Sequence, residues 1–232
     1  MDFDNTEDLS KSFFLAQISH DLRQPMQALS IYVCSLLGEK LTPEQYHIAK
    51  NIESSTNNLK NMLNNLLDIS QIDARGLLYT PQTLDTKELL TRIAEEYKII
   101  AQCQHIKFYS GFHQGLVYSD SICIERIVRN LLSNALKYNG GKIIFGSRQE
   151  QNYIRIFVID NGCGISADEI DKIFNAFYQS NQSNENRYIG AGLGLTICKK
   201  LAQILGTKIE VKSIEGRGTC FSFSLPINNN TK

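Results

Sequence analysis

The stretch NLLSNALKYN, residues 130–139, constrains the fold of this 232-residue sequence more strongly than any other. It closes a predicted helix over residues 121–138, in which apolar side chains recur every three or four positions. At about 100° per residue, the opposite side of that helix is a narrow polar arc formed by Arg126, Asn130, Asn134 and Lys137. Asparagine is a poor helix former, so two of them on one face are unusual. The pattern favours amide oxygens that hold Mg²⁺ beside phosphate, the alternative being an ordinary solvated face.

A glycine-rich turn, DNGCGI, occupies residues 160–165. The apolar strand predicted before it ends in Asp160, and Gly162 and Gly164 let the backbone turn sharply and approach a ligand. A carboxylate in this place suits an exocyclic amine such as that of adenine, because it accepts a hydrogen bond. The alternative interpretation is a β-turn with a capping aspartate.

A second glycine-rich stretch, GAGLGL at 190–195, precedes a predicted helix and follows the polar run QSNQSNENRY. Free N–H groups at a helix N-terminus suit phosphate, and the polar run is predicted to be a flap that closes over a nucleotide. No G-x-x-x-x-G-K-[ST] motif is present, which excludes a P-loop. A Rossmann dinucleotide site needs a strand directly before its glycine-rich turn. The polar run occupies that place, which argues against a Rossmann site.

The C-terminal part alternates helical and strand-like segments. A capping box at 85–88 begins a helix whose inward positions are predicted to be Leu89, Ile93, Tyr97 and Ile100. Strands are predicted at 106–110, 116–118, 142–147, 153–160 and 219–225. We expect a two-layer α/β sandwich with a mixed sheet, that is, an α+β domain.

Residues 7–74 have the apolar spacing of two long helices. Gly38 is expected to end the first helix, and Thr42-Pro43-Glu44-Gln45 to begin the second. A lone hairpin cannot bury both apolar stripes, so we expect a homodimer that forms a four-helix bundle. The predicted domain limits are 1–76 for the hairpin, 77–84 for a linker and 85–228 for the α/β domain.

Composition excludes several classes of function. The 24 basic and 24 acidic residues balance, which argues against nucleic acid or an anionic membrane as a partner. No apolar run approaches the ~18 residues of a membrane span, and the polar start is unlike a signal peptide. The six cysteines lack a C-x-x-C pair, so reduced thiols in a cytoplasmic chain are expected, and Cys103, His105 and His113 match no standard metal site.

Together these segments resemble the catalytic core of a sensor histidine kinase, over essentially the whole chain. The matching boxes, in family order, are SHDLRQP (H-box), NLLSNALKYN (N-box), DNGCGI (G1), IFNAFYQ (F-box), GAGLGL (G2) and GTCFSFSLP (G3). The resemblance implies a dimerisation and phosphotransfer domain followed by the histidine kinase ATPase fold. It also implies a two-component phosphorelay: an ATP-dependent protein-histidine kinase that phosphorylates itself and then an aspartate of a response-regulator receiver domain.

The H-box resemblance makes His20 the phosphoacceptor and Asp21 the group that polarises its imidazole. A histidine with an ordinary pKa of about 6.5 keeps a neutral, nucleophilic fraction at neutral pH. Pro25 removes the N–H that would bond to the Asp21 carbonyl, so a bend is expected there. Gln24 stands where the commonest H-box has Thr or Asn, and its longer side chain changes the reach toward the water used in dephosphorylation.

The same resemblance assigns the Mg²⁺ and ATP site. Asn130 is the primary Mg²⁺ ligand, and Asn134 is its neighbour at the metal and the phosphates. Asp160 reads the adenine amine, and Arg187 is a further candidate for the γ-phosphate. The other cofactor-binding positions are Lys137, Tyr138, Gly162, Gly164, Gly190, Gly192, Leu193, Gly194 and Thr219.

Two other functions use the same nucleotide boxes. An ATPase of the gyrase, chaperone and mismatch-repair type would lack the H-box hairpin, and a dimeric signalling scaffold would bind nucleotide without phosphotransfer. The sequence does not specify the input signal, the cognate regulator, or transfer in cis or in trans. We expect the core to be part of a longer sensor, since no sensor domain is recognisable in it.

Overall fold

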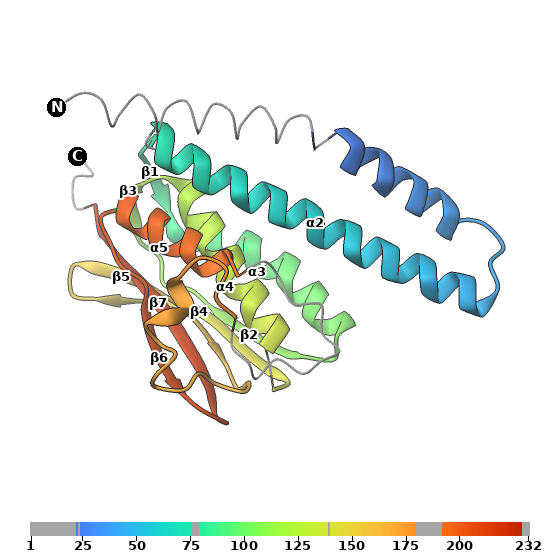
Figure 1. The fold of residues 1–232 in the computed structure, drawn as a ribbon. Coiled ribbons are helices and arrows are strands. Elements are labelled where there is room, and N and C mark those ends of the chain that lie inside the picture. The colour runs from blue at the N-terminus through green and yellow to red at the C-terminus, as the bar shows by residue number, and fades with distance from the viewer. Residues whose placement is uncertain (1–21, 23, 76–78, 139, 180–191, 229–232) are drawn as a thin grey trace. The chain divides into compact units, whose positions relative to one another are not determined.

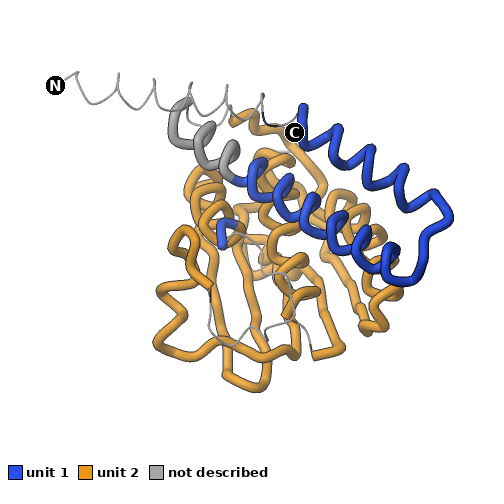
Figure 2. The backbone as a smooth tube through the Cα atoms, turned by 45° about the vertical axis from the view of Figure 1, so that its right-hand side comes forward, with its two compact units in different colours: residues 1–78, 183–193 blue, residues 79–182, 194–232 orange. Residues whose placement is uncertain are grey.

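The computed structural model describes residues 22, 24–75, 79–138, 140–179 and 192–228, with only the backbone described for 66–75. The chain divides into two compact units, shown in two colours in Figure 2. Unit 1 comprises residues 1–78 and 183–193, and unit 2 comprises 79–182 and 194–232. Among the described residues, no helix combines the length and the apolar character needed to cross a membrane.

Unit 1 contains a helical hairpin, as predicted. Residues 24–37 form one helix and α2 (Pro43–Arg75) the other. The first helix ends at Gly38, whose N–H donates to the carbonyl of Ser35 at 3.0 Å. At the start of α2, the Thr42 N–H donates to Gln45 Oε1 at 3.0 Å and the Gln45 N–H to Thr42 Oγ1 at 3.3 Å. The predicted capping box is therefore formed.

Only part of the hairpin's apolar surface is covered. Met26, Val33 and Ala49 are buried. Other apolar side chains of the two helices are more than two fifths exposed, namely Leu22, Leu29, Ile31, Leu36, Ile48, Ile52, Leu59 and Met62. A single copy of the hairpin thus leaves much apolar surface in water.

Unit 2 is built on a five-stranded sheet in the order β2-β4-β5-β7-β6 (Figure 1). Its strands are β2 (Lys107–Gly111), β4 (Lys142–Glu150), β5 (Tyr153–Asp160), β6 (Glu210–Ile214) and β7 (Gly218–Pro226). β2 runs parallel to β4 and the other neighbours are antiparallel, so the sheet is mixed. β1 (Gln82–Asp85) and β3 (Leu116–Ser119) form a second, antiparallel pair.

Helices α3 (Thr86–Cys103), α4 (Ser121–Tyr138) and α5 (Gly194–Ile204) lie on one face of this sheet, as Figure 1 shows, and a short 3₁₀ turn covers Lys172–Phe174. The two-layer α/β sandwich is thereby confirmed. The strands contribute alternate residues to the core, among them Ile143, Phe145, Ile154, Ile156, Val158, Phe221, Phe223 and Leu225. The predicted apolar side of α4 is buried at Ile127, Val128, Leu131, Leu132 and Ala135.

Three details differ from the sequence prediction. β1 lies within and just after the stretch interpreted as a linker, where Gln82-Thr83-Leu84 is too short to show alternation. β6 was not predicted, because it is a short edge strand in which the polar residues Lys212 and Ser213 interrupt the apolar pattern. In α3, Ile100 is 41% exposed and Ala101 is fully buried instead. A spacing of seven from Ala94 and four from Tyr97 puts Ala101 on the buried stripe.

Candidate nucleotide site

The polar side of α4 faces the first residue of α5. A Cβ atom built on Gly194 would lie 3.2 Å from Oδ1 of Asn130, so the amide oxygen of Asn130 points at the N-terminus of α5. The thiol of Cys198, one turn after Gly194 in α5, contacts the carbonyl of Ile127, one turn before Asn130 in α4, at 3.8 Å. The Asn-rich face and the glycine-rich helix start, 64 residues apart in sequence, therefore meet.

The remaining predicted residues of α4 lie at its C-terminal end. Asn134 is one turn beyond Asn130 on the same face, and both are partly exposed. Lys137 places its Nζ 4.8 Å from the centroid of the Tyr138 ring, a cation–π distance. This end of α4 thus offers amide oxygens, one ammonium group and one aromatic ring to a ligand.

The turn after β5 crosses directly over the end of α4. The N–H of Gly162 donates to Asp160 Oδ1 at 2.8 Å. A Cβ at Gly162 would lie 1.7 Å from the carbonyl oxygen of Tyr138, and one at Gly164, where φ is +71°, would lie 2.1 Å from that of Ile214. Both predicted glycines are therefore required by close backbone approach.

Asn161 holds this crossing in place and was not singled out from the sequence. Its Oδ1 accepts from the Lys142 N–H at 2.8 Å, and its Nδ2 donates to the carbonyl of Gly140 at 3.3 Å. The signal that could have identified it is an asparagine between Asp and Gly in a turn, because such a side chain readily forms hydrogen bonds with nearby backbone groups.

Asp160 and Thr219 are direct partners across β5 and β7, and Thr219 is buried. Burial raises the pKa of the Asp160 carboxyl above its ordinary value, although the N–H groups of Gly162 and Thr219 oppose that shift. A carboxylate held at the end of an apolar strand beside a hydroxyl can accept hydrogen bonds from a polar ligand edge.

At the start of α5, Gly192 has a φ of +68° and Leu193 directly precedes the helix. The hydroxyl of Thr196 donates to the carbonyl of Phe174 at 3.1 Å, which joins the first turn of α5 to the 3₁₀ turn. The sequence analysis did not single out Thr196.

Four of the predicted site residues lie outside the described residues, namely His20, Asp21, Arg187 and Gly190.

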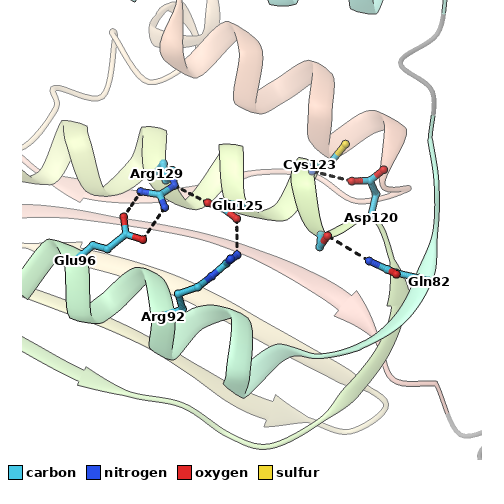
Figure 3. Close-up of polar contacts among 8 residues, drawn as sticks. Gln82, Arg92, Glu96, Asp120, Cys123, Glu125 and Arg129 are labelled. Carbon is cyan, nitrogen blue, oxygen red and sulfur yellow. Dashed lines mark hydrogen bonds and ion pairs between the residues drawn. The ribbon is translucent and has the colours of Figure 1, made fainter.

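A network of ion pairs fixes α4 against α3 (Figure 3). Arg129, the neighbour of Asn130, donates to both oxygens of Glu96, at 2.8 and 3.1 Å, and to Glu125 at 2.8 Å. Arg92 of α3 donates to the other oxygen of Glu125 at 2.8 Å. These contacts resist rotation of α4, so they also keep the direction in which Asn130 points.

Asp120 caps the first turn of α4. Its Oδ1 accepts from the Cys123 N–H at 3.0 Å, and its Oδ2 accepts from the N–H and hydroxyl of Thr80, at 3.0 and 3.2 Å. Burial disfavours the charged form, yet these hydrogen bonds, with one from the Ile122 N–H, outweigh it and hold the pKa of Asp120 below its ordinary value. The start of α4 is thereby tied to the segment that enters unit 2.

Comparisons with known proteins agree with this arrangement. Residues 119–229, a range that covers most of unit 2, match the family described as histidine kinase-, DNA gyrase B-, and HSP90-like ATPase. Residues 10–75 match the His Kinase A (phospho-acceptor) domain. The crystal structure of full-length ShkA in complex with AMPPNP is similar with a TM-score of 0.76 at 25% identity, over 92% of this chain and 46% of that one.

Curated relatives match nearly the whole of this chain. Sensor histidine kinase RcsC of Salmonella typhimurium is 29% identical over 222 residues, which cover 94% of this chain and 23% of RcsC. Sensor protein GacS of Pseudomonas syringae pv. syringae is 32% identical over 231 residues, covering 94% of this chain and 25% of GacS. The chain therefore belongs to the sensor histidine kinase family, and it spans about a quarter of the length of these relatives.

Proposed function

We propose that this chain is an ATP-dependent protein-histidine kinase that phosphorylates its own His20 from Mg-ATP. The phosphoryl group then passes to an aspartate on the receiver domain of a response regulator. The observation that carries the proposal is the meeting of Asn130 with the start of α5 in the same domain that pairs Asp160 with Thr219. The family match of a phospho-acceptor domain ahead of the ATPase domain supports the transfer step.

In the proposed reaction, a ring nitrogen of His20 attacks the γ-phosphorus of ATP. The new N–P bond forms as the bond to the β–γ bridging oxygen breaks and ADP leaves. Asp21 accepts the proton or hydrogen bond of the other ring nitrogen, which offsets the positive charge that develops on the imidazole. Both residues belong to the predicted domain 1–76, so the reaction requires the two units to approach one another.

The residues of α4 fit the triphosphate and its metal. Asn130 and Asn134 would hold Mg²⁺ through neutral amide oxygens, which do not repel phosphate, and Lys137 would contact a phosphate. Mg²⁺, when bound, neutralises charge on the phosphate oxygens. Gly194 leaves space beside Asn130 Oδ1, since even a Cβ would come within 3.2 Å of it. With Gly190, Gly192 and Leu193, this glycine would place free N–H groups near the phosphates.

The base would lie between the end of α4 and the end of the sheet. Tyr138 would lie against the adenine ring, and Asp160 would accept a hydrogen bond from its amine. Gly162 and Gly164 would shape this pocket, and Thr219 would line it. The AMPPNP in the ShkA complex supports nucleotide binding by the equivalent domain here.

The hairpin supports a homodimer as the active form. Exposed apolar side chains such as Ile52 and Leu59 would be covered by a second copy in a four-helix bundle. We place the reaction in the cytoplasm, where ATP and reduced cysteines such as buried Cys198 are both expected. The limits 1–76, 77–84 and 85–228 remain our prediction for the domains.

The test uses ATP labelled on the γ-phosphate. We expect acid-labile label on the wild-type protein and none on His20→Gln, while His47→Gln, an exposed histidine of α2, keeps the label. Label that survives His20→Gln would remove His20 from its role. ATP hydrolysis without any protein label would favour the ATPase alternative, and ADP binding without either would favour the scaffold.

A further inference from the structure

The end of the sheet at the candidate base pocket carries a row of three polar residues. Asp160 of β5 pairs with Thr219 of β7, and Thr219 pairs with Ser213 of β6. Paired residues point to the same face of a sheet, so the three side chains lie side by side. The next row on that face is apolar and consists of Val158, Phe221 and Val211.

The hydroxyl of Ser213 makes three hydrogen-bond contacts. It accepts from the N–H of Ile165 at 2.8 Å and donates to the carbonyl of Gly218 at 3.0 Å. Its Oγ also lies 2.9 Å from Oγ1 of Thr219. Ser213 therefore connects β6, the start of β7 and the turn that follows Asp160.

The number of available protons sets the direction of the bond between Ser213 and Thr219. A serine hydroxyl has one proton and two lone pairs. Because a carbonyl can only accept, the contact with Gly218 uses the one proton of Ser213. The Ile165 N–H takes one lone pair, and the other accepts the hydroxyl proton of Thr219. Thr219 is left with lone pairs alone for a ligand.

We propose that Ser213 is a positioning residue that makes Thr219 a hydrogen-bond acceptor, so that Thr219 and Asp160 together select adenine nucleotides over 6-oxopurine nucleotides. The inference rests on the proposed function, in which both residues line the base pocket. Adenine presents an amino donor at position 6, whereas hypoxanthine presents a carbonyl that would face two acceptors. A site built to form hydrogen bonds rejects a group that leaves them unmade.

The test compares the dissociation constants of ADP and inosine diphosphate by calorimetry at one magnesium concentration. We expect the wild-type chain to prefer ADP, and Ser213→Ala to narrow that preference about five- to tenfold. The reason is that the hydroxyl of Thr219, freed from Ser213, can turn and donate to the 6-oxo group. Ser213→Thr keeps the hydroxyl and should restore the wild-type ratio.

Ser147→Ala is the matched control. Ser147 also lies buried on the covered face of the sheet and accepts an N–H, that of His113 at 3.0 Å, but it belongs to β4 outside the row. It should leave the ADP preference unchanged. A merely structural role for Ser213 would lower thermal stability in both alanine variants without changing the ratio of the two nucleotides.

An unchanged ratio in folded Ser213→Ala would overturn the positioning role while leaving the proposed kinase function intact. If Ser213→Ala does not fold, Thr219→Val removes the acceptor directly and should narrow the preference to a similar extent; full discrimination in that variant would equally overturn the inference. A wild-type chain that binds neither nucleotide would contradict the proposed function and this inference with it.

Discussion

The hairpin of unit 1 and the sandwich of unit 2 differ in how completely one chain covers its apolar side chains. In the hairpin, Ile31 is 66% exposed and Leu59 54% exposed. In the sandwich, large side chains such as Ile93 and Phe145 are fully buried. Full burial of such a side chain stabilises a fold by roughly 1.5–3 kcal/mol. The sandwich therefore has its own core, whereas the hairpin leaves apolar surface that, in the proposed homodimer, a second copy would cover.

The contrast matches the roles proposed for the two units. A nucleotide site needs side chains held in fixed directions, and unit 2 supplies them through a closed core and the ion pairs around Arg129. A phosphoacceptor presented on a bundle shared by two chains depends instead on assembly. We therefore expect that a substitution can disrupt the dimer without affecting the nucleotide site, and the reverse.

The largest effect is expected from breaking the hairpin's exposed face. The double variant Ile52→Glu, Leu59→Glu buries four charges per dimer, so the dimer dissociation constant should rise more than about a hundredfold. Analytical ultracentrifugation measures the dimer and calorimetry measures ADP affinity, which should stay within about twofold. The matched control is Ile99→Glu, a 63% exposed apolar residue of α3, which should leave the dimer intact. If the double variant dimerises as strongly as Ile99→Glu, the predicted four-helix bundle is contradicted.

The next effect concerns the metal in unit 2. Asn130→Asp adds a negative charge beside the phosphates, and we expect autophosphorylation to fall by at least about tenfold with an altered magnesium dependence. Asn152→Asp, the same change at an exposed position next to β5, serves as the control. Normal rates and an unchanged magnesium profile in Asn130→Asp would exclude this residue as a ligand.

A smaller effect is expected at the cap of α4. Asp120→Ala removes the acceptor for the N–H groups of Cys123 and Thr80 and should lower the free energy of unfolding of unit 2 by about 1–2 kcal/mol. The pKa of Asp120 is lower in the folded state than its ordinary 3.8, so its contribution is complete above that pH. It disappears as the pH falls through the folded-state pKa.

Denaturant titrations of the wild type and Asp120→Ala between pH 7 and pH 2 measure this contribution. The two stability curves should be separated at pH 7 and converge at the acid end. A constant separation over the whole range would show that the Asp120 carboxylate charge does not contribute. Since Asp120 belongs to unit 2, the dimer should persist in the variant at neutral pH.

The smallest effect is expected from the ion pairs between α3 and α4. Glu96→Gln removes one exposed charge facing Arg129, and the free energy of unfolding should fall only slightly, because solvent screens exposed ion pairs. Added salt should reduce the difference, because exposed charges are screened. A large loss of stability that salt does not change would mean that the Arg129 contact acts through packing instead.

Local sequence signals predicted most of the fold. The strand over 153–160 and the helix over 121–138 coincide with β5 and α4, because long alternating or helical patterns dominate local preference. The cap at Thr42 and the helix end at Gly38 were predicted from the turn chemistry of single residues. Edge strand β6 escaped prediction, since its pairing with β7 outweighs its weak pattern.

For the candidate site, the residue types and their order are visible in the sequence alone: amides on α4, an acid before glycines at 160–164, and glycines ahead of α5. These are short-range features, fixed by helix period and backbone freedom. The long-range neighbours came from the fold: Asn130 beside Gly194, Tyr138 beneath Gly162, and Ser213 in a row with Thr219 and Asp160. Strand register joins residues more than 50 positions apart, and no local periodicity encodes that pairing.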